Sequence, residues 1–252
     1  MMQNYSVLMS VYYKEKPEYL EQAIESVQSQ TFPTDDFILV CDGPLNDALD
    51  KVIAKKQQEM GITLNVVRLA KNGGLGNALN EGIKHCKNEL VARMDSDDIA
   101  YPDRCEKQLA VFNEHPEVSI CSGIVEEFTT DPNTVDAKRV PPETNAEIVE
   151  FAKKRNPFNH PCVMYKKLRS RGGWFLPGLL LVGGLLPLAP DANGRISGVQ
   201  HSGAAAPYES WLGYVLAACW LEICQDAGKA VQVYEAERLH WKGSVHKELR
   251  DS

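Results

Sequence analysis

The chain has 252 residues, of which 44% are hydrophobic and 24% are charged. This length and apolar content support one sizeable core, or one domain with a smaller appended lobe. The formal net charge is -7 and the pI is near 5.4, so the charge balance gives no support for a nucleic-acid partner. The seven cysteines include no C-x-x-C pair, which favours reduced thiols in a cytosolic protein over a disulfide framework.

The N-terminal part of the chain alternates between apolar strands and amphipathic helices. We expect strands at Tyr5–Tyr12, Phe37–Cys41, Leu64–Leu69 and Leu90–Met94, and helices at Pro17–Gln30, Leu49–Met60 and Gly73–His85. The first residues show no basic region followed by a cleavage site, so we expect no signal peptide. Strands that alternate with helices predict an α/β fold with a mostly parallel sheet, helices on both faces, and ligands beyond the carboxyl ends of the strands.

A second part of the chain follows with a less regular pattern. We expect a helix at Pro102–Phe112, a strand at Val118–Phe128, a polar loop at Asp131–Pro142, a helix at Ala146–Arg155 and a strand at Cys162–Lys166. The polar loop predicts a boundary, which divides residues 1–130 from residues 131–167. His160 lies in a loop between prolines, where a structural or solvated role is more common than contact with a substrate.

The stretch Leu90–Ala100 ends in Asp95, Ser96, Asp97 and Asp98. Three neighbouring carboxylates repel one another unless a cation or polar ligand lies among them. Mg²⁺ and Mn²⁺ prefer oxygen ligands, and Mg²⁺ often shares its ligands between carboxylates and phosphates. The Asp-x-Asp pattern therefore suggests a metal–diphosphate site, whereas the alternative is a solvated turn that caps the next helix through Asp98 or Asp103.

Other polar residues also lie at the predicted carboxyl ends of strands, namely Ser10, Tyr12, Asp42 and Asn72. Carboxyl ends of parallel strands meet at one edge of a sheet, so one crevice could collect these residues and the acidic cluster. This coincidence favours a binding site over a simple helix cap.

The segment Asn72–Ala78 is rich in glycine and opens a helix. Gly74-x-Gly76 is similar to part of a dinucleotide fingerprint, but Leu79 occupies the third glycine position and the loop does not follow the first strand. A nicotinamide cofactor is therefore disfavoured. We expect the loop to bring backbone amides toward a diphosphate; the alternative is that its glycines only permit a tight turn.

Five blocks resemble, in order, the family 2 glycosyltransferases of bacterial exopolysaccharide and lipopolysaccharide assembly. The blocks are MSVYYKEKPEYLEQAIESVQSQT, LVCDGP, NGGLGNALNEG, ARMDSDDIAYPDRCEKQL and RNPFNHPCVMYKK, within Tyr5–Lys167. The resemblance implies the GT-A fold, a nucleotide-diphospho-sugar donor, a divalent cation (Mn²⁺ or Mg²⁺) and inversion at the anomeric carbon. It also implies a nucleotide-sugar-binding half at residues 1–130 and the start of an acceptor-side half at 131–167.

The resemblance also implies roles for single residues. Ser10 and Tyr12 match the base-contacting loop, and Asp42 matches the carboxylate that bonds the base, although Cys41 stands where the family often has a second acid. Asn72 lies near a residue that contacts the diphosphate or the base. Asp95 matches the acid on the ribose side and Asp97 matches the metal ligand. The family's commonest donor is a UDP-sugar, and its acceptors are glycans or lipid-linked sugars.

The resemblance stops near Lys167. The family's general base is the Asp of an E-D-x-x-L-W-x-R-M block, and the segment Leu168–Pro190 contains no acidic residue. The glycines and prolines of that segment interrupt its apolar run, so we expect no transmembrane segment. The catalytic base of this chain is therefore unknown.

A shift of reading frame in the gene near Lys167–Leu168 would explain the missing block. In the neighbouring frame, codons for Gly183–Asp191 (GGLLPLAPD) can encode EDYYLWLRM, which matches the family. We therefore interpret residues 168–252 as an out-of-frame tail whose pattern does not specify a core. The hypothesis predicts poor packing from Leu168 onward, exposed apolar surface around Leu179–Leu188, and no catalytic role for Asp191, Glu209 or Glu222.

Two other functions fit some of these features. A non-catalytic nucleotide-sugar-binding module would explain the missing base without any error in the gene. A sugar nucleotidyltransferase would need a basic, glycine-rich loop after the first strand, and Ser10–Pro17 offers tyrosine and glutamate there. For the leading interpretation, a glycosyltransferase without its base, we expect a cytoplasmic protein that acts peripherally at the inner face of the membrane.

Overall fold

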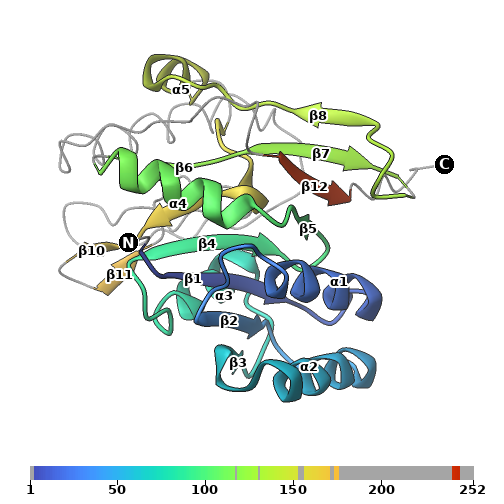
Figure 1. The fold of residues 1–252 in the computed structure, drawn as a ribbon. Coiled ribbons are helices and arrows are strands. Elements are labelled where there is room, and N and C mark those ends of the chain that lie inside the picture. Colours follow the sequence, from blue (N-terminus) through green and yellow to red (C-terminus); the bar gives the residue numbers. More distant parts are fainter. Residues whose placement is uncertain are drawn as a thin grey trace, which may run out of the picture.

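A computed structural model of the chain describes residues 3–116, 118–129, 131–152, 156–170, 173–175 and 240–244. Figure 1 shows a central sheet with helices packed against it, and a second group of strands above that sheet. The expected α/β architecture is confirmed, and its mostly parallel sheet is the part of the fold that positions the candidate site.

The central sheet has six strands in the order β3-β2-β1-β4-β9-β6. Strand β1 pairs in parallel with β2 and β4, β2 pairs in parallel with β3, and β9 runs antiparallel to both β4 and β6. The carboxyl ends of β1, β2, β3 and β4 therefore meet at one edge. The bounds are β1 (Tyr5–Val11), β2 (Asp36–Cys41), β3 (Leu64–Arg68), β4 (Leu90–Asp95), β6 (Ile120–Cys121) and β9 (Met164–Lys166).

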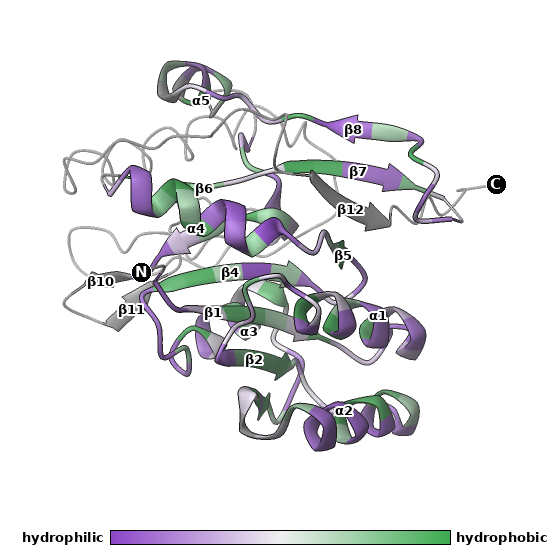
Figure 2. Cartoon of the chain, viewed as in Figure 1, coloured by the Kyte–Doolittle hydropathy of each residue, from purple (hydrophilic) through white to green (hydrophobic). Residues whose placement is uncertain are grey.

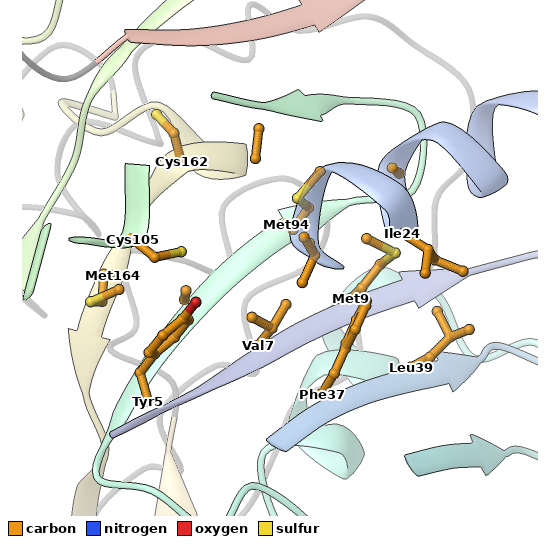
Figure 3. Close-up of a cluster of buried hydrophobic side chains, with 14 of the residues drawn as sticks. Tyr5, Val7, Met9, Ile24, Phe37, Leu39, Met94, Cys105, Cys162 and Met164 are labelled. Carbon is orange, nitrogen blue, oxygen red and sulfur yellow. The ribbon is translucent and has the colours of Figure 1, made fainter. Parts of the chain in front are cut away.

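Alternate strand residues point to opposite sides of this sheet, and both sides carry apolar residues. Helices therefore cover both faces. On one face, α1 (Pro17–Gln28), α2 (Asp47–Met60) and α4 (Arg104–Glu114) pack on a buried cluster that contains Val7 and Met9. Figure 3 shows both side chains beside Phe37 and Leu39 of β2. On the other face, α3 (Leu75–Gly82) packs on a second cluster, which contains Leu8.

The local sequence explains the bounds of the first helices. Pro17 begins α1, where a missing amide hydrogen costs nothing, and the buried face of α1 is the predicted one, made of Leu20, Ala23, Ile24 and Val27. Helix α2 begins two residues before the predicted start because the Asn46 side chain accepts a hydrogen bond from the Leu49 amide at 3.0 Å. Figure 2 shows hydrophobic strands β1 and β2, whereas α2 mixes hydrophilic and hydrophobic residues.

A second sheet has the order β5-β12-β7-β8, with β5 (Ile99–Ala100), β7 (Ile124–Phe128), β8 (Ala137–Arg139) and β12 (His240–Ser244). The prediction of one strand over Val118–Phe128 is wrong, because β6 and β7 belong to different sheets. The chain changes sheet at Ser122 and Gly123, which Asn159 holds through its backbone amide and its side-chain amide. The predicted loop Asp131–Pro142 contains the edge strand β8.

Other elements also differ from the predicted ranges. Helix α3 is shorter than Gly73–His85, and α5 covers Asn145–Ala152. Short 3-10 helices lie at η1 (Gly61–Thr63) and η2 (His160–Cys162), and β10 (Leu168–Ser170) pairs antiparallel with β11 (Gly173–Phe175). Five cysteines lie among the described residues, and all of them are buried and free: Cys41, Cys86, Cys105, Cys121 and Cys162.

One segment of the predicted tail takes part in the second sheet. Strand β12 pairs in parallel with β7 and antiparallel with β5. The segment Leu179–Leu188 and the acids Asp191, Glu209 and Glu222 lie outside the described residues. The poor packing expected from Leu168 onward and the frame-shift hypothesis therefore stay predictions.

Candidate functional site

The structure brings all six predicted site residues into the lining of one pocket. The pocket has a volume of about 350 Å³ and lies where β1, β2 and β4 end. Its lining contains Ser10, Tyr12, Asp42, Asn72, Asp95 and Asp97, together with Val11, Glu15, Gly74, Leu75 and Ser96. The sequence argument that strand ends meet at one edge is therefore confirmed for these positions.

The order of the strands explains why the pocket forms there. The chain continues from β1 to β2 on one side and reaches β4 on the other side, so the connections diverge at β1. In open α/β sheets, ligands bind at such a divergence, beyond the carboxyl ends of the strands. Ser10 lies directly opposite Asp95 in the β1–β4 register, which places a hydroxyl and a carboxylate on adjacent strands at this point.

Three carboxylates form an acidic cluster, and two of them, Asp95 and Asp97, line this pocket. Oxygen atoms of Asp95, Asp97 and Asp98 all lie within 4.8 Å of one another. Burial raises the pKa of Asp97, and the negative charges of Asp95 and Glu15 add to this rise, which brings the pKa to about 6. A cluster of hard oxygen atoms that repel one another fits a divalent cation such as Mg²⁺ or Mn²⁺.

The alternative role of these acids as a helix cap receives less support. Asp103 is the residue before α4, but its side chain accepts no capping hydrogen bond and instead pairs with Lys107 at 2.5 Å. Asp98 is 6% exposed and belongs to the carboxylate cluster. The acidic turn is therefore a local concentration of charge at the pocket, and the Asp103 side chain does not cap α4.

Asp95 is held in place by Arg93, a residue that the sequence analysis did not single out. Arg93 Nη1 donates a hydrogen bond to Asp95 Oδ2 at 2.6 Å, and Arg93 Nη2 forms an ion pair with Asp95 Oδ1. Residues two apart on a strand share a face, so the sequence pattern Arg-x-Asp carried a signal for this pair. The buried guanidinium of Arg93 therefore contacts both carboxylate oxygens of Asp95 and fixes their orientation from the core side.

Glu15 is a second site residue that the sequence analysis missed. The Ser96 hydroxyl donates a hydrogen bond to Glu15 Oε2 at 2.7 Å, which links the loop after β1 to the middle residue of the Asp-x-Asp turn. Glu15 follows the first strand, whose end lies at the same edge, so its position offered a weak signal. Its charge adds to the negative end of the pocket.

Asp42 fastens the glycine loop to the end of β2. Asp42 is 4% exposed, and its two oxygens accept hydrogen bonds from the amides of Gly73 at 2.8 Å and Gly74 at 2.9 Å. The Asn72 side chain also donates to the Asp42 carbonyl at 3.2 Å. The expectation that the loop amides point toward a diphosphate is therefore wrong for these two amides, because the carboxylate already binds them.

A second, larger pocket adjoins the first and shares Asp95 and Asp97 with it. Its volume is about 760 Å³. Side chains of the second sheet and of the segment 156–161 line it, and Lys138, Arg139 and His160 are among them. The acidic cluster thus lies between two cavities, one at the end of the parallel strands and one beneath the second sheet.

Comparison with known proteins identifies the family of the chain. The sequence model of glycosyl transferase family 2 matches residues 6–170. The amylovoran biosynthesis glycosyltransferase AmsE of Erwinia amylovora is 45% identical over 163 residues, which cover 65% of this chain and 60% of AmsE. The UDP-Gal:alpha-D-GlcNAc-diphosphoundecaprenol beta-1,3-galactosyltransferase of Escherichia coli is 38% identical and covers 65% of this chain, with 58% of its own length matched.

Solved structures agree in fold. S. aureus TarS in complex with UDP-GlcNAc matches with a TM-score of 0.55 at 17% identity, covering 97% of this chain and 59% of TarS. The mannosyltransferase PcManGT of Pyrobaculum calidifontis, in complex with GDP-Man and Mn²⁺, has a TM-score of 0.55 at 16% identity, covering 98% of this chain and 59% of PcManGT. The expected GT-A fold is thereby confirmed.

The chain matches only part of the length of its relatives. The chain spans about 60% of the length of the first curated relatives that it matches. Within the described residues, no helix combines the length and the apolar character that a membrane crossing needs. The family match covers most of the chain and includes every predicted site residue, and we conclude that this chain belongs to glycosyl transferase family 2.

Proposed function

We propose that this chain binds a nucleotide-diphospho-sugar in the pocket at the ends of β1, β2 and β4. We further propose that it belongs to an inverting glycosyltransferase, which moves the sugar to a hydroxyl group of a glycan or lipid-linked acceptor in bacterial surface polysaccharide assembly. The observation that carries the proposal is the meeting of Ser10, Tyr12, Asp42, Asn72, Asp95 and Asp97 around one pocket.

The proposed roles follow from the position of each residue. Tyr12 is 43% exposed in the lining of the pocket, where its aromatic ring can pack against a base. Asp42 lines the same pocket with Ser10 and Asn72. Each of its oxygens accepts one loop amide and retains a second lone pair, which would accept a hydrogen bond from an N–H group of the base. Asp95 would face the ribose.

Asp97 would hold the divalent cation, Mn²⁺ or Mg²⁺, with Asp98 as its neighbour in the cluster. The fit is supported by the raised pKa of Asp97, since a carboxyl group that is buried and lies near the charges of Asp95 and Glu15 is stabilised by a nearby positive charge. When bound, such a cation neutralises negative charge on the leaving diphosphate. The residues of this chain would position the donor so that its phosphates reach that end of the pocket.

We propose a UDP-sugar as the donor. The E. coli relative is named for UDP-Gal, and TarS was solved with UDP-GlcNAc, which supports uridine as the base. PcManGT was solved with GDP-Man, so guanosine is the competing base. Competition between UDP and GDP for the pocket would decide between them.

The acceptor would enter the second pocket. That cavity of about 760 Å³ shares Asp95 and Asp97 with the donor pocket, so a hydroxyl group placed there would lie beside the sugar end of the donor. Lys138 and Arg139 contribute positive charge to its lining, although each is paired with a glutamate of β7. This polar cavity suits an acceptor with hydroxyl groups.

We also propose that this exact chain transfers sugar poorly, if at all. The sequence after Lys167 lacks the block that supplies the general base, and the family model ends at residue 170. Without a base, deprotonation of the acceptor hydroxyl loses a contribution of roughly 10²–10⁴ in rate. The nucleotide sequence of codons 160–215 tests the frame-shift explanation, since codons that forbid EDYYLWLRM in the neighbouring frame would eliminate it.

The non-catalytic binding module and the sugar nucleotidyltransferase receive less support. The relatives above are named glycosyltransferases, and Glu15 and Tyr12 occupy the loop where a nucleotidyltransferase would need basic residues. If the chain is a non-catalytic module, it should bind the donor but not hydrolyse it, even when the neighbouring reading frame after Lys167 is restored. Donor hydrolysis by a frame-restored chain therefore separates an enzyme from a module.

The central experiment is titration of UDP into the full chain with and without MnCl₂. We expect Mn²⁺-dependent binding, which Asp97→Ala should remove. Asp103→Ala is the matched control, because Asp103 belongs to the same acidic stretch but is absent from both pocket linings. If Asp97→Ala binds UDP and Mn²⁺ as well as the parent chain does, the proposed site is wrong.

A further inference from the structure

Arg93 lies in an environment that is unusual for an arginine. It is 1% exposed in the middle of β4 and is among the largest fully buried side chains of the described residues. In the β1–β4 register it lies opposite Leu8, and Val91 precedes it on the same face of the strand. Leu8 and Val91 belong to the apolar cluster beneath α3, so the guanidinium rises from a hydrophobic layer.

The guanidinium is directed at a single carboxylate. Nη1 and Nη2 contact the two oxygens of Asp95, in the two-pronged arrangement that arginine forms with carboxylates. The remaining nitrogen, Nε, is buried and has no hydrogen-bond partner in the described part of the chain. Both terminal nitrogens of Arg93 therefore contact Asp95, whereas its Nε donor is unsatisfied among the described residues.

Stability alone is a poor reason for such a pair. Burying a charge requires its removal from water, and apolar side chains of similar volume often serve a core as well or better. The backbone of Arg93 is also held without the guanidinium. Its amide donates to the Val163 carbonyl at 2.9 Å, and its carbonyl accepts from Arg104 Nη2 at 2.7 Å.

The outer side of Asp95 explains what the pair can do. Asp95 has a side chain that is 32% exposed, and it lines both pockets beside Asp97. A carboxylate held at both oxygens cannot rotate, so its outward lone pairs keep one direction.

We propose that Arg93 is a positioning residue of the donor site: it fixes the carboxylate of Asp95 toward the pocket. This inference rests on the proposed donor-binding function and adds a residue to it. Groups that orient the direct contacts of a metal–ligand site typically change affinity by about 10–100-fold when they are replaced. Arg93 should act on the ligand only through Asp95.

A double-mutant cycle tests this dependence. Arg93→Met is made in the parent chain and in an Asp95→Asn chain, and the Kd for UDP in the presence of MnCl₂ is measured by calorimetry. We expect Arg93→Met to weaken binding by about 10–100-fold in the parent chain. In the Asp95→Asn chain the same substitution should change the Kd by less than about twofold, because the contact that it removes is already lost.

Two further variants separate positioning from general support of the fold. Arg93→Lys keeps the charge but has no planar fork, so it should also weaken binding, by about 10-fold or more. Arg104→Lys is the matched control: Arg104 is 4% exposed, and its guanidinium contacts the backbone carbonyls of Arg93 and Val163. We expect it to lower the melting temperature while the Kd changes by less than about twofold.

The outcomes are distinct. Equal losses from Arg93→Met with and without Asp95→Asn, or parent-like binding by Arg93→Lys, would overturn the positioning role and leave the donor site intact. If Arg93→Met does not fold, Arg93→Lys completes the same cycle. A parent chain that binds no UDP with MnCl₂ would overturn the proposed function together with this inference.

Discussion

Asp97→Asn should make the metal-free chain more stable at neutral pH. The pKa of Asp97 in the folded chain is about 6, above the ordinary value of 3.8, because burial and the charges of Asp95 and Glu15 oppose its ionised form. The folded state therefore binds the proton more tightly than the unfolded chain does. Asparagine has the shape of the protonated acid and carries no charge, so it removes this opposition.

The size of the effect follows from the two pKa values. Each pKa unit corresponds to about 1.36 kcal/mol, so a rise from 3.8 to about 6 corresponds to about 3 kcal/mol when the group is fully ionised. Asp97 is partly exposed, and water screens some of the repulsion, so we expect a gain of about 1–3 kcal/mol. The cost of the charge is absent below about pH 4, grows as the pH rises to about 6, and is complete above it.

Urea unfolding of the parent chain and Asp97→Asn, from pH 4 to pH 8 with EDTA present, measures this difference. We expect near-equal stability at pH 4 and the full gain at pH 7.5. Asp103→Asn is the control, because Asp103 forms a surface ion pair with Lys107 and should change stability by less than about 1 kcal/mol. A gain that does not vary with pH, or a loss of stability at pH 7.5, would refute the reasoning.

Three further changes should have measurable effects. Protons compete with a cation for Asp97, so the Kd for Mn²⁺ with UDP should rise by up to about tenfold per pH unit below pH 6, measured by calorimetry. Asp42→Asn replaces one of two accepting oxygens with a donor that faces an amide, and should lower the free energy of unfolding by about 1–3 kcal/mol. Gly43→Ala should lower the free energy of unfolding, measured by urea unfolding, by more than Gly61→Ala does. Both glycines have positive φ, but a Cβ at Gly43 would lie 2.5 Å from the Asn72 amide nitrogen, whereas one at Gly61 meets nothing within 4 Å.

Local pattern in the sequence was sufficient for the parallel part of the fold. Each of the first four strands is a short apolar run, and each following helix repeats its apolar residues at helical spacing. These signals depend on neighbours within a few residues, so no tertiary information was needed to place them. The edge where Ser10, Asp42 and Asp95 meet follows from the same pattern, because parallel strands align their carboxyl ends.

Long-range pairing decided the rest. The run Val118–Phe128 reads as one strand, yet its two halves join different sheets because their partners, β9 and β8, lie elsewhere in the chain. The predicted helical range Gly73–His85 was also too long, since α3 covers Leu75–Gly82. Local periodicity carries no information about which distant strand satisfies a given backbone amide.

The sequence by itself determined which side chains gather at the rim of the sheet, since local periodicity shows where strands end and parallel strands align their carboxyl ends at one edge. Only the tertiary structure decided what each one does there. It assigns the Gly73 and Gly74 amides to Asp42, the Ser96 hydroxyl to Glu15, and the Arg93 guanidinium to Asp95. The physical reason is that a hydrogen bond depends on distances of a few tenths of an ångström between groups from different elements, and those distances arise only when the elements pack.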